Sequence, residues 1–555
     1  MNLEILKQNP FCLDEEALNW VQTVFKEMSE EEKIGQVIQD GSMELRNIQR
    51  PLELGGFHRM VTHSPKALRD SAEEMQKNAR IPKLLSADMD HLSYGINPEG
   101  TPFTDQMGVA ACDDPEIAWM MGIVAARECK AMGFNWSFTP VVDINYNFKN
   151  QIVNIRSFGS DPDRVLRMAS AYVKGMQGEG VAACLKHWPG DGIDDRDQHN
   201  IPTVNSLDMD TWRKTYGRNY RQLIREGVMT IMSAHIMLPA YYREKDPAFP
   251  VEKMLPGSLS KELNLELLRG ELGFNGLIIT DATNMGGYGV NGRRRELLPM
   301  SIENGCDMLM FVKDYEEDIR ALKDALNDGK LSRRRLDEAV TRVLGLKAAL
   351  GLHRKKKAGK YAPLPREQAL LGCEEHRKWA SKAAERSITL VKDTQRLLPV
   401  LPDRYRRVLL IEGKATGQFG DPKELGFAAE LRAQGFVVTQ YTPRIRITSD
   451  QFDLIIYAVA QECIMVRDNT RMDMIRLMGD IMSAMERRWD DIPLMFISFG
   501  SPYHLYDFPY IKTFINAYSS VEPVKKAAAE MITGKKPFFG KNPVDPFCGL
   551  ESARL

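Results

Sequence analysis

The chain has 555 residues, which is enough for at least two domains with large cores. Its 74 Lys and Arg residues nearly balance its 75 Asp and Glu residues, so no global field attracts nucleic acid or an anionic membrane. No apolar run approaches the roughly 20 residues that span a bilayer, and the first residues lack the basic and apolar regions of a secretory signal. These properties predict a cytoplasmic protein that acts on a neutral small molecule, with no nucleic-acid or membrane partner.

The eight cysteines are scattered along the chain. They form no Cys-x-x-Cys pair and no Cys/His cluster with zinc-finger spacing. We expect them to be reduced thiols.

The N-terminal part begins with helices. An amphipathic helix is expected from Asp14 to Met28, and a second one begins behind Ser29, an N-cap residue with Glu32 at the capping-box position. Short apolar segments then recur, most of them separated by stretches long enough for a helix. They lie near residues 34–39, 55–60, 82–88, 134–144, 181–186, 228–236, 275–280 and 306–312. Eight strands that alternate with helices predict a TIM-like (β/α)8 barrel of the α/β class.

Polar residues stand where these segments end. They are Asp88 and Asp90 after the third segment, Asp143 after the fourth, Lys186 and His187 at the fifth, His235 after the sixth and Asp281 at the seventh. Active sites of such barrels are built at the carboxyl ends of the strands. One polar residue there is a cap, whereas a succession of them predicts a ring around a pocket.

The stretch after the fifth segment is typical of acid–base chemistry. It reads Lys186-His-Trp-Pro-Gly-Asp-Gly192 and continues into an acidic loop in which Asp197 precedes His199 by two positions. An imidazole titrates near neutral pH, and a nearby carboxylate orients or charges it. His199 is therefore a candidate general acid/base, with Asp197 as its partner.

Two more residues complete the candidate site. Asp281 stands where an apolar strand opens into a loop, which makes its carboxylate the candidate nucleophile. Arg156 lies in an irregular loop before a helix, where a guanidinium can fork two hydroxyl groups. Structural roles remain open as alternatives: a loop cap for Asp281, a salt-bridge pair for Lys186 and His187, mutual pairing for Asp88 and Arg156, and strand-end packing for His235.

The character of the chain changes past residue 350. Residues 353–365 are first basic and then proline-bearing, which indicates a linker; a nucleic-acid patch is disfavoured because no aromatic residue is interleaved in the basic run 354–357. A helix near 366–386 leads to strands near 387–391, 407–412, 436–440, 453–460, 493–499 and 512–517. We predict a barrel catalytic domain at 1–350, a linker and connecting helix at 351–386, and a smaller α/β sandwich domain at 387–555.

Several motifs follow one another along nearly the whole chain. They are Met28-Ser-Glu-Glu-Glu-Lys-Ile-Gly-Gln36, Arg156-Ser-Phe-Gly-Ser-Asp-Pro162, Lys186-His-Trp-Pro-Gly190, Asp197-Gln-His199, Leu259-Ser260, Leu272-Gly-Phe-Asn-Gly-Leu-Ile-Ile-Thr-Asp281, Ser387-Ile-Thr-Leu-Val-Lys392 and Ser498-Phe-Gly-Ser-Pro502. In this order they resemble glycoside hydrolase family 3, in particular its two-domain β-N-acetylglucosaminidase (β-hexosaminidase) branch.

The resemblance implies a retaining exo-glycosidase that removes a terminal β-linked N-acetylhexosamine. Motif by motif, it makes Asp281 the nucleophile and His199 the acid/base with Asp197 as partner. The family's sugar-binding positions fall on Asp88, Arg156, Lys186 and His187. A retaining glycosidase needs a nucleophilic carboxylate and a second group that protonates the leaving oxygen, and neither a cofactor nor a metal is implied.

The chain also departs from that branch. It has Pro189-Gly-Asp-Gly192 where the branch commonly has Pro-Gly-His-Gly, and Asp88-Met-Asp-His-Leu-Ser93 where the branch has Asp-Gln-Glu-Gly-Gly. We therefore expect the aglycone or acyl side of the pocket to differ from that of the branch. N-acetyl specificity is therefore carried mainly by the Asp-x-His pair, which β-glucosidase members generally lack.

Other functions stay open. Because a histidine acid/base would not repel phosphate, the enzyme could be a glycoside phosphorylase, and β-glucosides or β-xylosides are alternative substrates. Two remoter alternatives are a barrel enzyme with magnesium or calcium bound by the acidic loop, and a sugar-binding relative without catalysis. The acidic loop contains Asp191, Asp194, Asp195 and Asp197.

Overall fold

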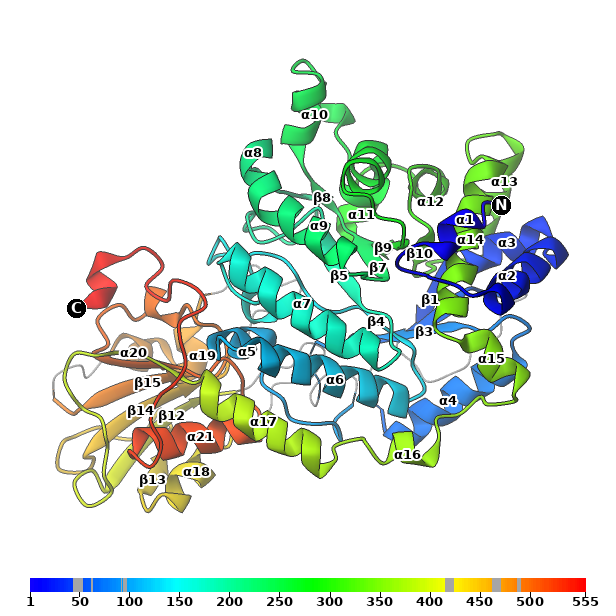
Figure 1. The fold of residues 1–555 in the computed structure, drawn as a ribbon. Helices are drawn as coiled ribbons and strands as arrows, with labels where there is room; N and C mark the ends of the chain where they lie inside the picture. The colour runs from blue at the N-terminus through cyan, green and yellow to red at the C-terminus, as the bar shows by residue number, and fades with distance from the viewer. Residues whose placement is uncertain are drawn as a thin grey trace. The chain divides into compact units, whose positions relative to one another are not determined.

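A computed structural model describes residues 1–42, 53–60, 63–90, 92, 97–414, 424–461, 471–486 and 491–555. By contacts, these residues form two compact units (Figure 1). The first comprises Met1–Thr101, Trp119–Ile144 and Val165–Cys373, and the second comprises Pro102–Ala118, Asn145–Arg164 and Glu374–Leu555.

The first unit is built on an eight-stranded parallel sheet. Its neighbours follow the order β4-β3-β2-β1-β10-β9-β7-β5, and parallel bridges from Trp136 to Ala182 and from Val141 to Lys186 join the β4 side to the β5 side. The strands are β1 (Ile38–Ser42), β2 (Gly56–Arg59), β3 (Leu84–Ala87), β4 (Trp136–Ser137), β5 (Cys184–Trp188), β7 (Thr230–Ser233), β9 (Leu277–Ala282) and β10 (Met308–Met310). The predicted TIM-like barrel is therefore confirmed.

Helices alternate with these strands along the chain. They are α1 (Glu4–Lys7), α2 (Glu15–Glu27), α3 (Glu30–Gln36), α4 (Pro65–Asn78), α6 (Pro115–Ala131), α7 (Pro162–Gly178), α8 (Met209–Trp212), η2 (Arg213–Gly217), α9 (Arg218–Arg225), α10 (Pro239–Lys245), η3 (Val251–Lys253), η4 (Gly257–Leu259), η5 (Glu262–Glu271), α11 (Gly286–Gly289), α12 (Arg294–Glu303), α13 (Tyr315–Asn327), α14 (Arg333–Ala349), α15 (Leu352–Lys357) and α16 (Pro365–Gln368). A small two-stranded sheet pairs β6 (Thr203–Val204) with β8 (Ile236–Met237).

The sequence dictates several of these helix ends. Ser29 accepts from the Glu32 amide while the Glu32 carboxylate accepts from the Ser29 amide, so the predicted capping box is present. Asp14 caps α2 by accepting from the Ala17 amide. The apolar face of α2 then packs into the core through Val21 and Phe25. Among the described residues, no helix is long and apolar enough to cross a membrane.

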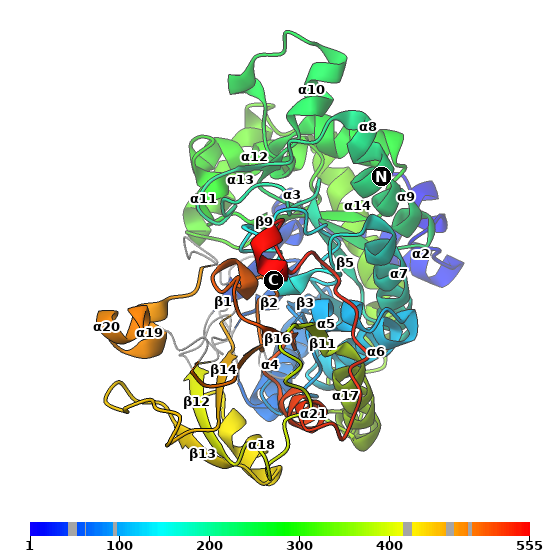
Figure 2. The same cartoon turned by 90° about the vertical axis from the view of Figure 1, so that its left-hand side faces the viewer.

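The second unit contains a six-stranded sheet of order β11-β16-β15-β14-β12-β13 (Figure 2). Its strands are β11 (Thr389–Asp393), β12 (Arg407–Gly413), β13 (Val437–Gln440), β14 (Leu454–Val459), β15 (Leu494–Ser498) and β16 (Thr513–Asn516). All neighbours are parallel except β11, which runs antiparallel to β16. Its helices are α5 (Gln106–Ala111), η1 (Asn154–Arg156), α17 (Glu374–Ser387), α18 (Phe427–Ala433), α19 (Met474–Met478), α20 (Ile481–Met485), η6 (His504–Tyr506), α21 (Glu522–Ile532) and η7 (Glu551–Arg554).

The linear domain boundaries at 350 and 386 stay a prediction. By contacts, the basic stretch up to Cys373 is grouped with the barrel, and α17 is grouped with the six-stranded sheet. Residues 102–118 and 145–164 lie between barrel strands in the sequence, yet they too are grouped with the six-stranded sheet. In this unit Met107 and Ile155 share a core cluster with Tyr518.

Candidate active site

The carboxyl ends of the barrel strands carry the charged residues expected from the sequence. Asp88 directly follows β3, Lys186 and His187 lie in the second half of β5, and Asp281 is the next-to-last residue of β9. Because the strands are parallel, these residues emerge at the same end of the barrel. The structure therefore brings residues together that lie up to 193 positions apart in the chain.

Lys186 and Asp88 form a direct ion pair. The Lys186 Nζ lies 2.7 Å from Asp88 Oδ1 and 3.8 Å from Asp90 Oδ2, and the Lys186 side chain is almost fully buried. His58 of β2 lies on the other side of the carboxylate, with its Nε2 3.5 Å from Asp88 Oδ2. Burial raises the pKa of Asp88, but the Lys186 charge and His58 outweigh it and hold this pKa well below the ordinary value. Asp88 is thus an anionic hydrogen-bond acceptor at neutral pH.

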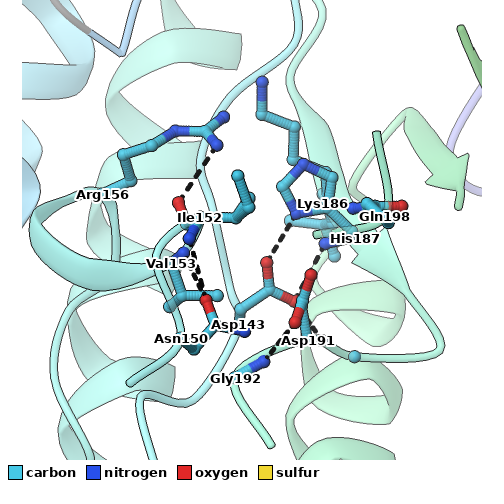
Figure 3. Close-up of polar contacts among 12 residues, drawn as sticks. Asp143, Asn150, Ile152, Val153, Arg156, Lys186, His187, Asp191, Gly192 and Gln198 are labelled. Atoms are coloured by element: carbon cyan, nitrogen blue, oxygen red, sulfur yellow. Dashed lines mark hydrogen bonds and ion pairs between the residues drawn. The ribbon is translucent and has the colours of Figure 1, made fainter. Parts of the chain in front are cut away.

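His187 is oriented by Asp143. The Asp143 Oδ2 accepts from His187 Nδ1 at 2.6 Å, and its Oδ1 accepts from the His187 amide at 3.0 Å and the Asp191 amide at 2.8 Å (Figure 3). Since a carboxylate only accepts, the His187 proton resides on Nδ1 and leaves Nε2 as the nitrogen that can meet a ligand. Asp143 is fully buried. It therefore fixes both the ring of His187 and the turn that follows β5.

Three histidine side chains lie close enough to Asp281 to change its pKa. The residue is 8% exposed, and its Oδ1 accepts from the following amide of Ala282 at 2.7 Å. Burial raises its pKa, but the nearby imidazoles of His235, His187 and His199 outweigh burial and lower the pKa below the ordinary value. The Asp281 carboxylate is therefore ionised at neutral pH, as a nucleophile must be.

His199 forms the expected pair with Asp197. The Asp197 Oδ1 accepts from His199 Nδ1 at 2.6 Å and from the His199 amide at 2.8 Å. Asp197 is buried, whereas the His199 side chain is 20% exposed. Because the carboxylate holds the proton on Nδ1, Nε2 is the nitrogen available for proton exchange at a partly open position.

The loop with His199 packs directly on the loop that follows Asp281. The Gly286 amide donates to the His199 carbonyl at 2.7 Å. A Cβ on Gly286 would lie 2.3 Å from the Asn200 carbonyl oxygen, and a Cβ on Gly287 would lie 2.2 Å from the Gln198 carbonyl oxygen. Only glycine therefore allows these two loops to come this close.

His235 forms hydrogen bonds with residues of both of these segments. Its amide donates to Gln198 Oε1 at 3.0 Å, and its Nε2 lies 3.1 Å from the Ala282 carbonyl oxygen. A carbonyl only accepts, so Nε2 carries the proton and Nδ1 accepts from the Ser258 hydroxyl at 2.9 Å. The ring is fully buried, and burial lowers its pKa despite the Asp281 charge. His235 therefore connects the two loops as a structural residue.

Arg156 is the one predicted site residue that the contacts group with the second unit. It ends η1, and its guanidinium donates to the Ile152 carbonyl at 3.2 Å (Figure 3). Gln106 in turn donates to the Arg156 carbonyl. These contacts hold the arginine against its own loop and against α5, and its sugar-binding role stays a prediction.

Sequence reasoning missed several residues that shape this site. Asp143 was recognised only as a strand-end carboxylate, and neither its pairing with His187 nor the contact of His58 with Asp88 was foreseen. The sequence reasoning gave no role to Gly286 and Gly287. Two adjacent glycines after a predicted catalytic carboxylate are a signal for close backbone approach, which is their role here.

The acidic loop after β5 forms local hydrogen bonds. Asp194 makes a bidentate pair with Arg196 and accepts from the Val204 amide at 3.0 Å, while Asp191 Oδ1 accepts from the Gly192 amide. Within the described ranges, no group of three His, Cys, Asp or Glu residues is arranged to hold a metal ion. The turn after β3 is one of the two stretches that differ from the family branch. Its residues His91 and Ser93 lie outside the described residues.

Comparisons with known proteins agree on one family. The family described as "Glycosyl hydrolase family 3 N terminal domain" matches residues 18–346. A curated relative from Cellulomonas fimi, named beta-N-acetylglucosaminidase/beta-glucosidase, is 37% identical over 98% of this chain and 99% of its own length.

Solved structures extend the likeness to the whole fold. A structure of beta-glucoside phosphorylase BglX bound to 2FGlc has a TM-score of 0.94 and 38% identity, and it covers 99% of this chain and 100% of that one. A glycoside hydrolase family 3 beta-N-acetylglucosaminidase from Paenibacillus sp. str. FPU-7 has a TM-score of 0.79 at 24% identity over 94% of this chain and 100% of that one. The second likeness concerns the fold alone.

Proposed function

Because the chain belongs to glycosyl hydrolase family 3, we propose that it removes a terminal β-linked N-acetylglucosamine by way of a covalent glycosyl-enzyme on Asp281. The observation that carries this proposal is the ionised Asp281 carboxylate beside a His199/Asp197 pair whose loop packs on the loop after β9. A nucleophile and a separate proton donor are the two groups that a retaining glycosidase requires.

The first step uses both groups. An Asp281 oxygen attacks the anomeric carbon, the bond from that carbon to the leaving oxygen breaks, and the His199 Nε2 proton moves to the leaving oxygen. The positive charge that His199 carries before transfer is balanced by Asp197, 2.6 Å from Nδ1. The products of this step are the free aglycone and a glycosyl ester on Asp281.

The second step reverses the proton flow. His199 Nε2, now neutral, takes a proton from water as the water oxygen attacks the anomeric carbon, and the bond to Asp281 breaks. The sugar is released with its original anomeric configuration. Lys186, His187, Asp88 and Arg156 are proposed to hold the hydroxyl groups of the sugar during both steps.

The names of two relatives indicate which sugars the enzyme could remove. The Cellulomonas fimi relative is named for both β-N-acetylglucosaminide and β-glucoside cleavage, and BglX is named for β-glucosides. N-acetylglucosamine is favoured here through the Asp-x-His pair, and glucose is the second glycone to test.

A second candidate function is phosphorolysis of the same substrates. The acid/base is an imidazole, and the charged groups that lower the pKa of Asp281 most are imidazoles. An anionic acid/base would repel phosphate, whereas a histidine does not. In this version, a phosphate oxygen replaces water in the second step and the product is a glycosyl phosphate. The likeness to beta-glucoside phosphorylase BglX over 99% of the chain supports this candidate.

The test is nitrophenol release from the β-N-acetylglucosaminide and the β-glucoside, each with and without inorganic phosphate, followed by product analysis. Wild type, Asp281→Asn and His199→Ala are compared, with Asp195→Asn, an exposed acid of the same loop, as the matched control. The proposal predicts turnover of the N-acetyl substrate that Asp281→Asn abolishes and the control keeps. His199→Ala is expected to lower this turnover by a smaller factor, because nitrophenol leaves without a proton.

The acceptor follows from the products. Free sugar at an unchanged rate with phosphate indicates hydrolysis, and a phosphate-dependent rate with a sugar phosphate product indicates phosphorolysis. Faster turnover of the β-glucoside than of the β-N-acetylglucosaminide would identify glucose as the sugar that the enzyme removes. Full activity of His199→Ala on both substrates would overturn the acid/base assignment.

A further inference from the structure

A cavity lies at the end of the barrel opposite to the candidate active site. Its volume is about 280 Å³, and its wall includes Pro82 and Phe134, which precede β3 and β4. Asp88 follows β3 at the other end, so six residues of extended chain, roughly 20 Å, separate Pro82 from the candidate active site. The cavity is therefore distinct from the pocket proposed to bind the sugar.

Basic side chains dominate this cavity. The described residues that line it include five basic residues and one acidic residue, namely Lys130, Lys355, Lys356, Lys360, Arg366 and Glu367. Most of them come from the basic stretch after α14 and from α16, the part of the sequence that the active-site chemistry does not use. This local excess of positive charge contrasts with the formal net charge of −1 for the whole chain.

The acidic residue of the cavity, Glu367, already has partners within the protein. Glu367 Oε1 lies 3.5 Å from Lys130 Nζ, and its Oε2 accepts from the Leu364 amide at 2.8 Å in the capping box of α16. After this pair is discounted, the cations of Lys355, Lys356, Lys360 and Arg366 still face the cavity. Their combined charge matches an anion with several negative charges.

The wall of the cavity also offers apolar surface. Lys356 Nζ lies 5.1 Å from the centre of the Tyr361 ring, which holds the ammonium and the aromatic side chain beside each other. Leu352 and Leu364 line the same cavity. A ligand with both a charged group and a flat or apolar body would use both kinds of surface.

We propose that this cavity binds a small organic phosphate that carries at least two phosphoryl groups, such as a nucleoside diphosphate. The lysines supply point charges and Arg366 supplies a guanidinium fork for phosphoryl oxygens. The organic body lies against Tyr361 and Leu364. This inference does not depend on the proposed glycoside chemistry, because it uses none of the active-site residues.

The experiment is calorimetric titration of the full-length protein with ADP, with inorganic pyrophosphate and with adenosine at low salt. We expect saturable binding of ADP, weaker binding of pyrophosphate and none of adenosine. Lys360→Glu and Arg366→Glu, both at exposed positions, are expected to weaken ADP binding at least about tenfold each, since each reverses a charge at the cavity. Lys330→Glu, an exposed lysine away from the cavity, is the matched control and should leave ADP binding unchanged.

The outcomes separate the possible sources of an ADP signal. Loss of binding in Asp281→Asn or His199→Ala, with normal binding in Lys360→Glu, would place the anion at the active site and overturn the proposal. Equal weakening by Lys330→Glu and Lys360→Glu would show non-specific attraction. The proposal would also be contradicted if the wild-type protein bound neither ADP nor pyrophosphate saturably. Nitrophenyl glycoside turnover of Lys360→Glu, expected to equal wild type, verifies that the variant is folded.

Discussion

The two segments that carry the proposed catalytic groups are fixed in different ways. Asp281 lies within a regular, fully buried strand, β9, whose neighbours β7 and β10 hold it from both sides. His199 lies on an irregular loop and owes its position to Asp197, to the Gly286 amide and to the Gln198 contact with His235. The nucleophile is therefore positioned by the barrel, and the acid/base by a few specific contacts.

This difference predicts different responses to substitution. A change at the nucleophile removes chemistry without disturbing its surroundings, because the strand stays in place. A change near the acid/base displaces the loop and affects catalysis through geometry, where an error of about 1 Å can reduce a rate roughly 100-fold. The substitutions below test this contrast, from the largest expected effect to the smallest.

Asp281→Asn is expected to have the largest effect. The amide cannot form the glycosyl ester, so we expect kcat/KM for the β-glycoside to fall at least about 1,000-fold. The melting temperature should stay near that of wild type, because the strand contacts do not involve the carboxylate. An activity loss accompanied by global destabilisation would contradict the contrast between strand and loop.

His199→Ala is expected to depend on the leaving group. Loss of a general acid costs about 100- to 10,000-fold for a poorly activated aglycone and much less for nitrophenol, which leaves without a proton. The measurement is kcat/KM for a nitrophenyl and an alkyl glycoside of the same sugar. Asp197→Asn should show the same pattern with a smaller loss, since it removes the partner and keeps the ring. Equal losses on both aglycones would contradict an acid role for His199.

Gly287→Ala tests the contact between the loops. The added Cβ would lie 2.2 Å from the Gln198 carbonyl oxygen, so the loop with His199 must shift. We expect kcat to fall roughly 10- to 100-fold, with a smaller change in KM. Gly289→Ala in the same short helix is the matched control, because no atom lies within 4 Å of its added Cβ. Similar activity in the two variants would show that the close approach has no catalytic role.

His235→Gln tests the buried histidine that connects both loops, through the pH dependence of protein stability. Burial lowers the folded-state pKa of His235 below 6.5, so the unfolded state binds more protons once the pH falls below about 6.5. His235 therefore makes wild type lose stability as the pH falls from about 6.5, by at most about 1.4 kcal/mol per pH unit. Glutamine does not titrate and can still donate to the Ala282 carbonyl. Its melting temperature should decline less between pH 7.5 and 5, and an identical decline would contradict the role of His235.

The fold was largely predictable because each barrel strand is a short apolar segment between helices. β1 is the exception: the predicted segment began at residue 34, whereas α3 continues to Gln36 and the strand runs from Ile38 to Ser42. The helix that begins behind the Ser29 capping box continues through residues 34–36. The strand itself contains buried Gln39, which bonds to the Leu84 carbonyl and the Ser86 hydroxyl. A polar strand of this kind gives no apolar signal.

The site was predictable in its residues but not in its pairings. Strand ends indicate which residues reach the carboxyl face of a barrel, and the Asp197/His199 pair is local in sequence. The contact of Asp143 with His187 and that of Gly286 with His199 join residues 44 and 87 positions apart. Such contacts depend on the register between strands and on loop paths, which local sequence patterns do not contain.

The central claim is that Asp281 becomes covalently glycosylated, and mass spectrometry tests it most directly. The protein is incubated with a 5-fluoro β-N-acetylglucosaminide bearing a reactive leaving group, and the intact mass and digested peptides are measured. We predict one added fluoroglycosyl group on the peptide that contains Asp281, and none in Asp281→Asn. A label on another residue, or continued turnover by Asp281→Asn, would contradict the account.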